Sequence, residues 1–341
     1  MNPEKYLINK LEEVNKIIFS ELMEQYGDPP IEKVMPLLLF RKIVEKCDAI
    51  KILHDNNCGQ PALSFARSVL ENRWYFMFII DNDSEFRSLS YYYFDKKDNA
   101  KKEIKEMEYY NTVLLENISK NEGYIIQYQA KISLVEGLKE KCVIRKKFFQ
   151  NQKLAKLPNT MWEEINIKYD EMIKGHEEEI IKNKLKIEEI EKRIESFNVQ
   201  IEEMKITKER QEKILRRLNQ DELFLEVRQE EKKLLGKRPN WYTLKTGISS
   251  IFQLSKNLVL QDEYITYARL SQEVHSANAS QQLIVDNNIT TLTNFRDEKG
   301  SEFAMAMAST FLSYSIEPFL KFYGKEEIYK EISERMYQFY K

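Results

Sequence analysis

The chain has 341 residues, of which 32% are charged and only 9 are Gly and 8 are Pro. Few turn-forming residues among many Lys, Glu and Ile favour long helices over a large sheet, and an aromatic content of 12% excludes global disorder. A formal net charge of −2 excludes a general electrostatic attraction to nucleic acid, so contact with RNA requires a local basic patch.

Several classes of site are excluded by missing motifs. The cysteines Cys47, Cys58 and Cys142 are scattered and odd in number, which is typical of reduced thiols in the cytoplasm. The charged start of the chain and the lack of a long apolar run predict neither an export signal nor a membrane span. Phosphate-loop, dinucleotide, zinc-protease and hydrolase-nucleophile motifs do not occur. We therefore expect a cytoplasmic protein with no cofactor and no metal.

Helical periodicity dominates the first part of the chain, where helices are predicted over residues 3–26, 31–55 and about 61–81. The second has an apolar face that includes Leu38, Ile43 and Ile50. The third is the most apolar stretch of the chain, so it is predicted to lie at the centre of the core. Within it, Arg67 and Glu71 are four residues apart and share one face. They form either an internal ion pair or the polar wall of a binding site.

From residue 98 the apolar pattern changes to a heptad repeat. Isoleucines seven apart mark one seam from Ile104 to Ile132, with Asn111 in place of one of them, and a second seam from Ile173 to Ile201. The intervening Leu-Pro-Asn predicts a turn. Residues 98–235 are therefore predicted to form an antiparallel coiled-coil hairpin. Residues 1–97 and 236–341 are predicted to form one discontinuous helical bundle into which the hairpin is inserted, so the fold class is all-α.

The predicted hairpin carries two further signals. His176 and Asn183 fall on d positions of the second seam, where polar residues usually set the register. The tip is basic and lacks acidic residues over RKKFFQNQKLAK, with aromatic residues between the charges. Such a tip is typical either of a solvated helix end or of a contact with RNA or a protein partner. Its charged residues are Arg145, Lys146, Lys147, Lys153 and Lys156.

After the hairpin, the stretch YITYARLSQEVHSA at residues 264–277 concentrates reactive side chains. In a helix, Tyr267, Ser271 and His275 share one face. That face is either a self-satisfied buried network or part of a site. Residues 277–300 are predicted to form a loop or a small hairpin, and two helices are predicted over residues 301–323 and 326–340.

Two of these stretches resemble an uncharacterised bacterial all-helical family. Its A-R-x-x-x-E motif falls on Ala66, Arg67 and Glu71, and its Y-x-x-L-S-x-x-V-H motif falls on Tyr267, Leu270, Ser271, Val274 and His275. The resemblance implies a helical fold and no particular activity. Arg269 and His275 also fit the R-x(4–6)-H pattern of HEPN-type ribonucleases, all-helical proteins in which Arg and His of two protomers meet over an RNA phosphate. Leu270 departs from that pattern, which commonly has a polar residue there.

The leading functional hypothesis is a metal-independent endoribonuclease that acts as a toxin or antiphage effector and forms a homodimer. His275 would be the general acid or base, Arg269 or Arg67 would stabilise the charge on phosphorus, and Ser271 would orient the phosphate beside Glu71. On one helix Arg269 and His275 point about 120° apart, so they would act together across a dimer or a helix break. The alternatives are a coiled-coil interaction protein and a helical nucleotide or small-molecule binding module.

Overall fold

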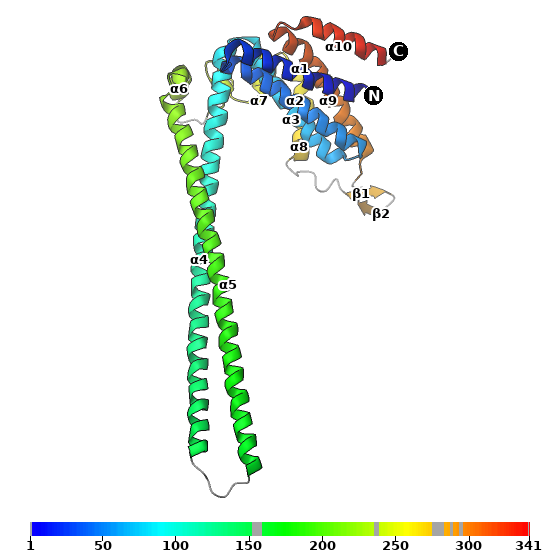
Figure 1. Ribbon diagram of the computed structural model, residues 1–341. Coiled ribbons are helices and arrows are strands. Elements are labelled where there is room, and N and C mark those ends of the chain that lie inside the picture. Colours follow the sequence, from blue (N-terminus) through cyan, green and yellow to red (C-terminus); the bar gives the residue numbers. More distant parts are fainter. Residues whose placement is uncertain are drawn as a thin grey trace. The chain divides into compact units, whose positions relative to one another are not determined.

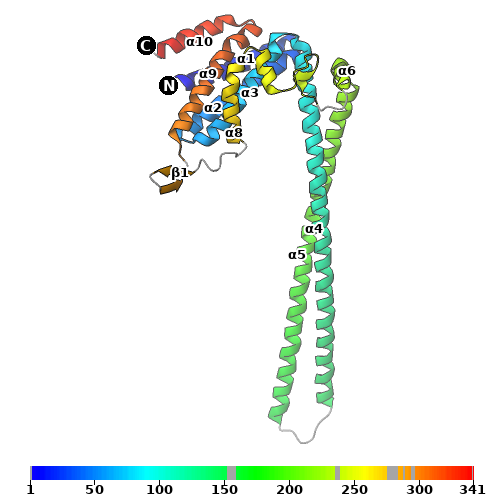
Figure 2. The ribbon, with the colours of Figure 1, turned by 180° about the vertical axis from the view of Figure 1, so that it is seen from behind.

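The computed structural model describes residues 2–151, 159–234, 239–274, 283–286, 289–292, 296–339 and 341. The fold class is all-α, as the scarcity of Gly and Pro predicts (Figure 1, Figure 2). The chain forms two compact units: the bundle unit, Met1–Lys96 with Leu218–Lys341, and the arm unit, Lys97–Arg217. Two long helices, α4 and α5, contribute residues to both units.

The bundle unit is built from helices of both chain termini. Its elements are α1 (Pro3–Tyr26), α2 (Ile31–Asp55), α3 (Gly59–Asp81), the first part of α4 (Ser84–Asn151), the last residues of α5 (Asn159–Gln220), the short 3₁₀ turns η1 (Glu222–Phe224) and η2 (Trp241–Thr243), α6 (Leu225–Lys233), α7 (Ile251–Asn257), α8 (Gln261–Val274), α9 (Glu298–Phe322) and α10 (Glu326–Phe339).

Local signals in the sequence set several helix ends. Asn2 caps α1 with its side chain, and Gly27 ends that helix with a φ of 68°. Asp297 caps α9 by accepting a hydrogen bond from the Gly300 N–H at 3.0 Å. The Asp297 N–H also donates to the Asn57 carbonyl at 2.8 Å, so the connection between α2 and α3 is tied to the start of α9.

α3 lies at the centre of the bundle core, as its apolar sequence predicts, and it packs against α2, α8 and α9. Trp74, Phe76 and Phe78 of α3 are fully buried. On α9, Ala304 and Ala308 are completely buried, because their small side chains let the two helices approach closely.

One predicted core position of α2 is wrong. Ile43 and Ile50 are completely buried, but Leu38 is 40% exposed. At 100° per residue Leu38 lies about 140° around the helix from Ile43, so it faces away from the side that packs against α3. The sequence analysis assigned Leu38 to the apolar face of α2 because it lies in an apolar run, although its angular position on the helix excludes it from that face.

The arm unit is an antiparallel helix pair, in which α4 and α5 lie side by side (Figure 1, Figure 2). Contacts between the two helices keep one register along their length. The paired residues are Gln150 with Asn166 (3.3 Å), Lys146 with Asp170, Lys139 with Glu177 (2.7 Å) and Glu108 with Lys208 (2.8 Å). The two residue numbers add up to the same total in all four pairs, so the register between the two helices does not shift along these contacts.

The seam of the arm follows the predicted heptads. Every buried residue on α4 and α5 within the described part of the arm unit lies at a predicted a or d position; these residues are Ala100, Ile132, Val135, Cys142, Ile180, Asn183, Ile190 and Ile201. Asn183 is the polar residue among them, and its side-chain nitrogen has no hydrogen-bond partner within the described residues. It therefore specifies register at some cost in stability.

α5 ends earlier than the heptad pattern indicated. The helix stops at Gln220, because Asp221 accepts a hydrogen bond from the Leu223 N–H (3.0 Å) and caps the turn η1. Phe224 is then buried in the bundle core, where it stacks on Tyr92 with ring centroids 6.0 Å apart. Residues 218–234, which the sequence assigned to the hairpin, thus belong to the bundle unit.

The segment between α8 and α9 contains the short strands β1 (Leu283–Asp286) and β2 (Ile289–Leu292). They pair antiparallel with Asp286 opposite Ile289, so the hairpin forms where the sequence left a loop or a hairpin open. Among the described helices, none combines the length and the apolar character needed to cross a membrane.

Candidate functional site

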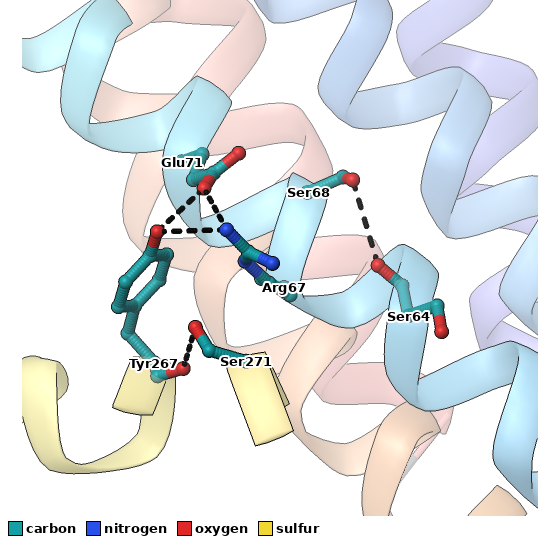
Figure 3. A network of polar contacts seen from close by, with 6 residues as sticks. All are labelled: Ser64, Arg67, Ser68, Glu71, Tyr267 and Ser271. Carbon is teal, nitrogen blue, oxygen red and sulfur yellow. Dashed lines mark hydrogen bonds and ion pairs between the residues drawn. The ribbon is translucent and has the colours of Figure 1, made fainter. Parts of the chain in front are cut away.

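Three polar side chains meet where α3 packs against α8. The Arg67 Nη2 donates to Glu71 Oε1 at 3.1 Å and to the Tyr267 hydroxyl oxygen at 3.0 Å. The Tyr267 hydroxyl in turn donates to the same Glu71 oxygen at 2.7 Å. Figure 3 shows the resulting triangle, in which Arg67 and Glu71 come from α3 and Tyr267 reaches across from α8. The sequence placed Arg67 and Glu71 on one face, and the structure adds the contact to α8.

This triangle is half-buried. The side chains of Arg67 and Glu71 are 18% and 27% exposed. The Arg67 guanidinium also stacks on the Tyr267 ring, with 5.1 Å between Cζ and the ring centroid. Its Nε is buried without a partner and its Nη1 donates no hydrogen bond to any described residue. The two N–H donors on Arg67 Nη2 are therefore engaged, and the donors on Nε and Nη1 have no partner among the described residues.

The contacts fix the protonation states of the group. Burial lowers the pKa of Arg67, but the hydrogen bond to Tyr267 and the charge of Glu71 outweigh burial and raise it. Burial, together with the hydrogen bond to Glu71, raises the pKa of Tyr267. Arg67 therefore stays charged and Tyr267 stays a neutral donor at physiological pH.

The other predicted site residues lie apart from this triangle. The Ser271 hydroxyl donates to the Tyr267 carbonyl at 2.8 Å, so it bonds within α8 (Figure 3). Arg269 is exposed and lies over the Phe303 ring of α9 at 5.1 Å. Two residues along a helix turn by about 200°, which directs Arg269 away from the face of Tyr267. His275 follows α8 directly and lies outside the described residues.

Aromatic side chains border the triangle. The Tyr75 ring lies 5.5 Å from the Trp241 ring and 6.2 Å from the Tyr242 ring. Burial raises the pKa of Tyr242 to about 12, and the neighbouring Tyr267 and the negative charge of Glu71 contribute to the rise. Burial and the charge of Glu71 also raise the pKa of Tyr75. Trp241 and Tyr242 are buried and pack against each other with ring centroids 5.6 Å apart, so these rings form a closed aromatic wall beside the charged pair.

A second ion pair between α3 and α8 was missed by the sequence analysis. Arg73 Nη1 donates to both carboxylate oxygens of Glu263 (2.7 and 2.6 Å), and the Trp74 indole N–H donates to Glu263 Oε2 at 2.8 Å. The Arg73 side chain is only 5% exposed. An arginine in the most apolar helix signals the need for a partner, but sequence spacing cannot identify one 190 residues away.

Within the described residues, no three His, Cys, Asp or Glu side chains are grouped as metal ligands. The triangle itself consists of an arginine, a tyrosine and a carboxylate group.

Comparison with known proteins gives one family match. The family described as "Family of unknown function (DUF5677)" matches residues 33–174. The matched segment runs from α2 into α5, so it includes Arg67 and Glu71 but ends before α8. No curated protein and no solved structure matches the chain significantly.

Proposed function

We propose that this protein is a metal-independent endoribonuclease of the HEPN type that acts as a toxin or antiphage effector. The observation that carries the proposal is the half-buried Arg67, which Glu71 and Tyr267 hold in place while Nη1 remains uncommitted within the described residues. A guanidinium fixed in this way is suited to a phosphate oxygen, because little order has to be gained on binding. His275 follows in sequence one helical turn after Ser271, on the same predicted face.

The roles follow from the chemistry of RNA cleavage without a metal. A base removes the 2′-hydroxyl proton, the 2′-oxygen attacks phosphorus, and the departing 5′-oxygen takes up a proton. In the proposal His275 moves one of these protons, Arg67 stabilises the negative charge on the phosphate oxygens, and Tyr267 donates a hydrogen bond. Glu71 opposes phosphate by its own charge, so its role is to position Arg67. Arg269 faces another side of α8 and would act on RNA held by a second copy of the chain.

A second candidate is a non-enzymatic coiled-coil interaction protein. The specific observation in its favour is that Arg67, Glu71 and Tyr267 hydrogen-bond to one another in a closed triangle. Such a network stabilises the packing of α3 on α8 without any ligand. Under this alternative, substitutions in the triangle change stability and nothing else.

The test is cleavage of total RNA by the purified chain, together with growth arrest on expression in bacteria. We expect His275→Ala to lower the cleavage rate by ~10²–10⁴-fold while the unfolding free energy changes by less than about 1 kcal/mol. Arg67→Lys should also lower it, since lysine keeps the charge but loses the planar fork. His54→Ala and Arg335→Ala, at the end of α2 and on α10, are the matched controls and should remain active.

Two results would overturn the ribonuclease proposal. One is a wild-type protein that neither cleaves RNA nor slows growth. The other is a His275→Ala variant that cleaves normally. Either result leaves the coiled-coil interaction protein, whose triangle variants would only melt earlier.

A further inference from the structure

The outer face of α4 carries a basic and apolar stripe, which we call the α4 stripe. It consists of the exposed c and g heptad positions from Lys120 to Phe148, none of which is Asp or Glu. Four of these positions are basic, including Lys131, Lys141 and Arg145, and four are apolar. Leu134 is 67% exposed and Phe148 is 54% exposed. Large apolar side chains repeated along one exposed face are typical of an interaction surface.

α5 carries a matching acidic and apolar stripe, the α5 stripe. It consists of the exposed b and f positions from Ile181 to Glu209, of which four are glutamates, four are apolar and one, Lys192, is basic. Leu185 is 59% exposed and Val199 is 54% exposed. Part of the stripe, including Glu195 and Val199, lines an open groove of about 540 Å³ on this side of α5.

The two stripes cannot reach one another within one arm. The a and d residues of both helices face each other across the seam, so the c, g, b and f positions face outward. Accordingly, the ion pairs that cross between α4 and α5 in the described residues use none of the stripe residues; they are Lys139–Glu177, Lys146–Asp170 and Lys208–Glu108. Opposite charges and similar apolar content therefore face solvent on two sides of the same arm.

We propose that copies of this chain associate through their arms, with the α4 stripe of one copy packed on the α5 stripe of the next copy. A second copy is the occupant because the chain itself supplies both complementary surfaces. Since the two stripes lie on two sides of the arm, each copy can offer its α4 stripe to one neighbour and its α5 stripe to another. Each stripe spans 29 residues, or about 42 Å of helix between its first and last residue at 1.5 Å per residue. Two such helix pairs present contact surfaces as long as those of stable coiled coils. This inference does not rest on the ribonuclease proposal.

The test uses charge reversal in the full-length chain, with molecular mass measured by sedimentation equilibrium over a range of concentrations. The first variant carries Lys131→Glu, Lys141→Glu and Arg145→Glu, and the second carries Glu188→Lys, Glu195→Lys and Glu202→Lys. Each variant alone should dissociate at least about tenfold more readily than the wild type, because both its stripes then carry the same charge. Mixed in equal amounts, the two variants should associate with one another, since each supplies the charge that the other lacks.

The matched control carries Lys102→Glu, Lys105→Glu and Lys147→Glu, which makes the same change in net charge on the same helix but away from the stripe. Its mass should equal that of the wild type, and circular dichroism should show unchanged helix content in all variants. A wild type that is monomeric at every concentration, an association that neither reversal weakens, or a variant mixture that stays monomeric would each overturn the proposal.

Discussion

At the scale of single residues, the contact between α3 and α8 depends on charges buried in pairs. Arg73 is nearly inaccessible to water and pairs with Glu263, which also accepts a hydrogen bond from the Trp74 indole N–H. Burial lowers the pKa of Arg73, and the charge of Glu263 offsets part of that effect. The desolvation of such a pair is tolerable only while both partners are present.

We therefore predict that Arg73→Ala or Glu263→Ala lowers the unfolding free energy by ~3–5 kcal/mol, because each leaves an uncompensated buried charge. The double variant Arg73→Met with Glu263→Leu should cost less than either single change. Denaturant unfolding of the full chain measures both. Glu331→Ala is the control, since it breaks an exposed pair with Lys10 (3.2 Å) and should cost at most about 1 kcal/mol. Single variants no worse than this control would contradict the prediction.

Sequence reasoning at this scale was limited by distance along the chain. The i, i+4 spacing of Arg67 and Glu71 made their pairing predictable, because neighbours on a helix face are fixed by helix geometry. The contact of Arg67 with Tyr267 spans 200 residues and depends on tertiary packing, which no local pattern encodes. The triangle could therefore be suspected but not assembled from the sequence, and whether it acts on RNA remains a proposal.

At the scale of elements, the arm was the most predictable part of the molecule. Ile132, Val135 and Ile180 form a buried apolar cluster in its seam, and Ile187 packs against them. Heptads are a local pattern, so they located the seam correctly. They did not locate the end of α5, since a side-chain cap at Asp221 stops the helix while apolar residues continue at similar spacing.

We predict that Ile132→Lys destabilises the arm by ~2–5 kcal/mol, because the substitution loses packing and places a charge in the seam. Ile126→Lys is the matched control on the same helix, where the side chain is already 65% exposed. It should change stability by less than about 0.5 kcal/mol. Helix content followed by circular dichroism during heating would compare the two variants, and equal melting would contradict the seam assignment.

At the scale of the whole molecule, buried tyrosines of the bundle unit link stability to alkaline pH. Burial, with the nearby charge of Asp95, raises the pKa of Tyr91 to about 12, and burial raises that of Tyr242 to about 12 as well. The usual tyrosine value is 10.0. The unfolded chain thus loses these protons first as the pH rises.

The contribution of Tyr91 and Tyr242 to the free energy of unfolding is therefore fully present below pH 10 and is lost as the pH rises towards about 12. Denaturant unfolding at a series of pH values should show this decline. Tyr91→Phe should make it shallower, whereas Tyr109→Phe, at a side chain that is 66% exposed on the arm, should leave it unchanged. A curve that Tyr91→Phe does not alter would contradict the assignment.

The fixed register of the arm also affects chain entropy. The two parts of the bundle unit are separated in sequence by residues 97–217, and closing a flexible loop of that length costs about 4 kcal/mol of conformational freedom. When α4 and α5 pair progressively along the arm, this single closure of a long loop is replaced by many small steps. Each step adds one helical turn to the part that is already paired. The contact of Glu103 with Gln211 shows that the pairing extends almost to the ends of the inserted segment. Pairing of α4 and α5 that begins at the tip of the arm therefore brings the C-terminal part of the bundle sequence close to the N-terminal part.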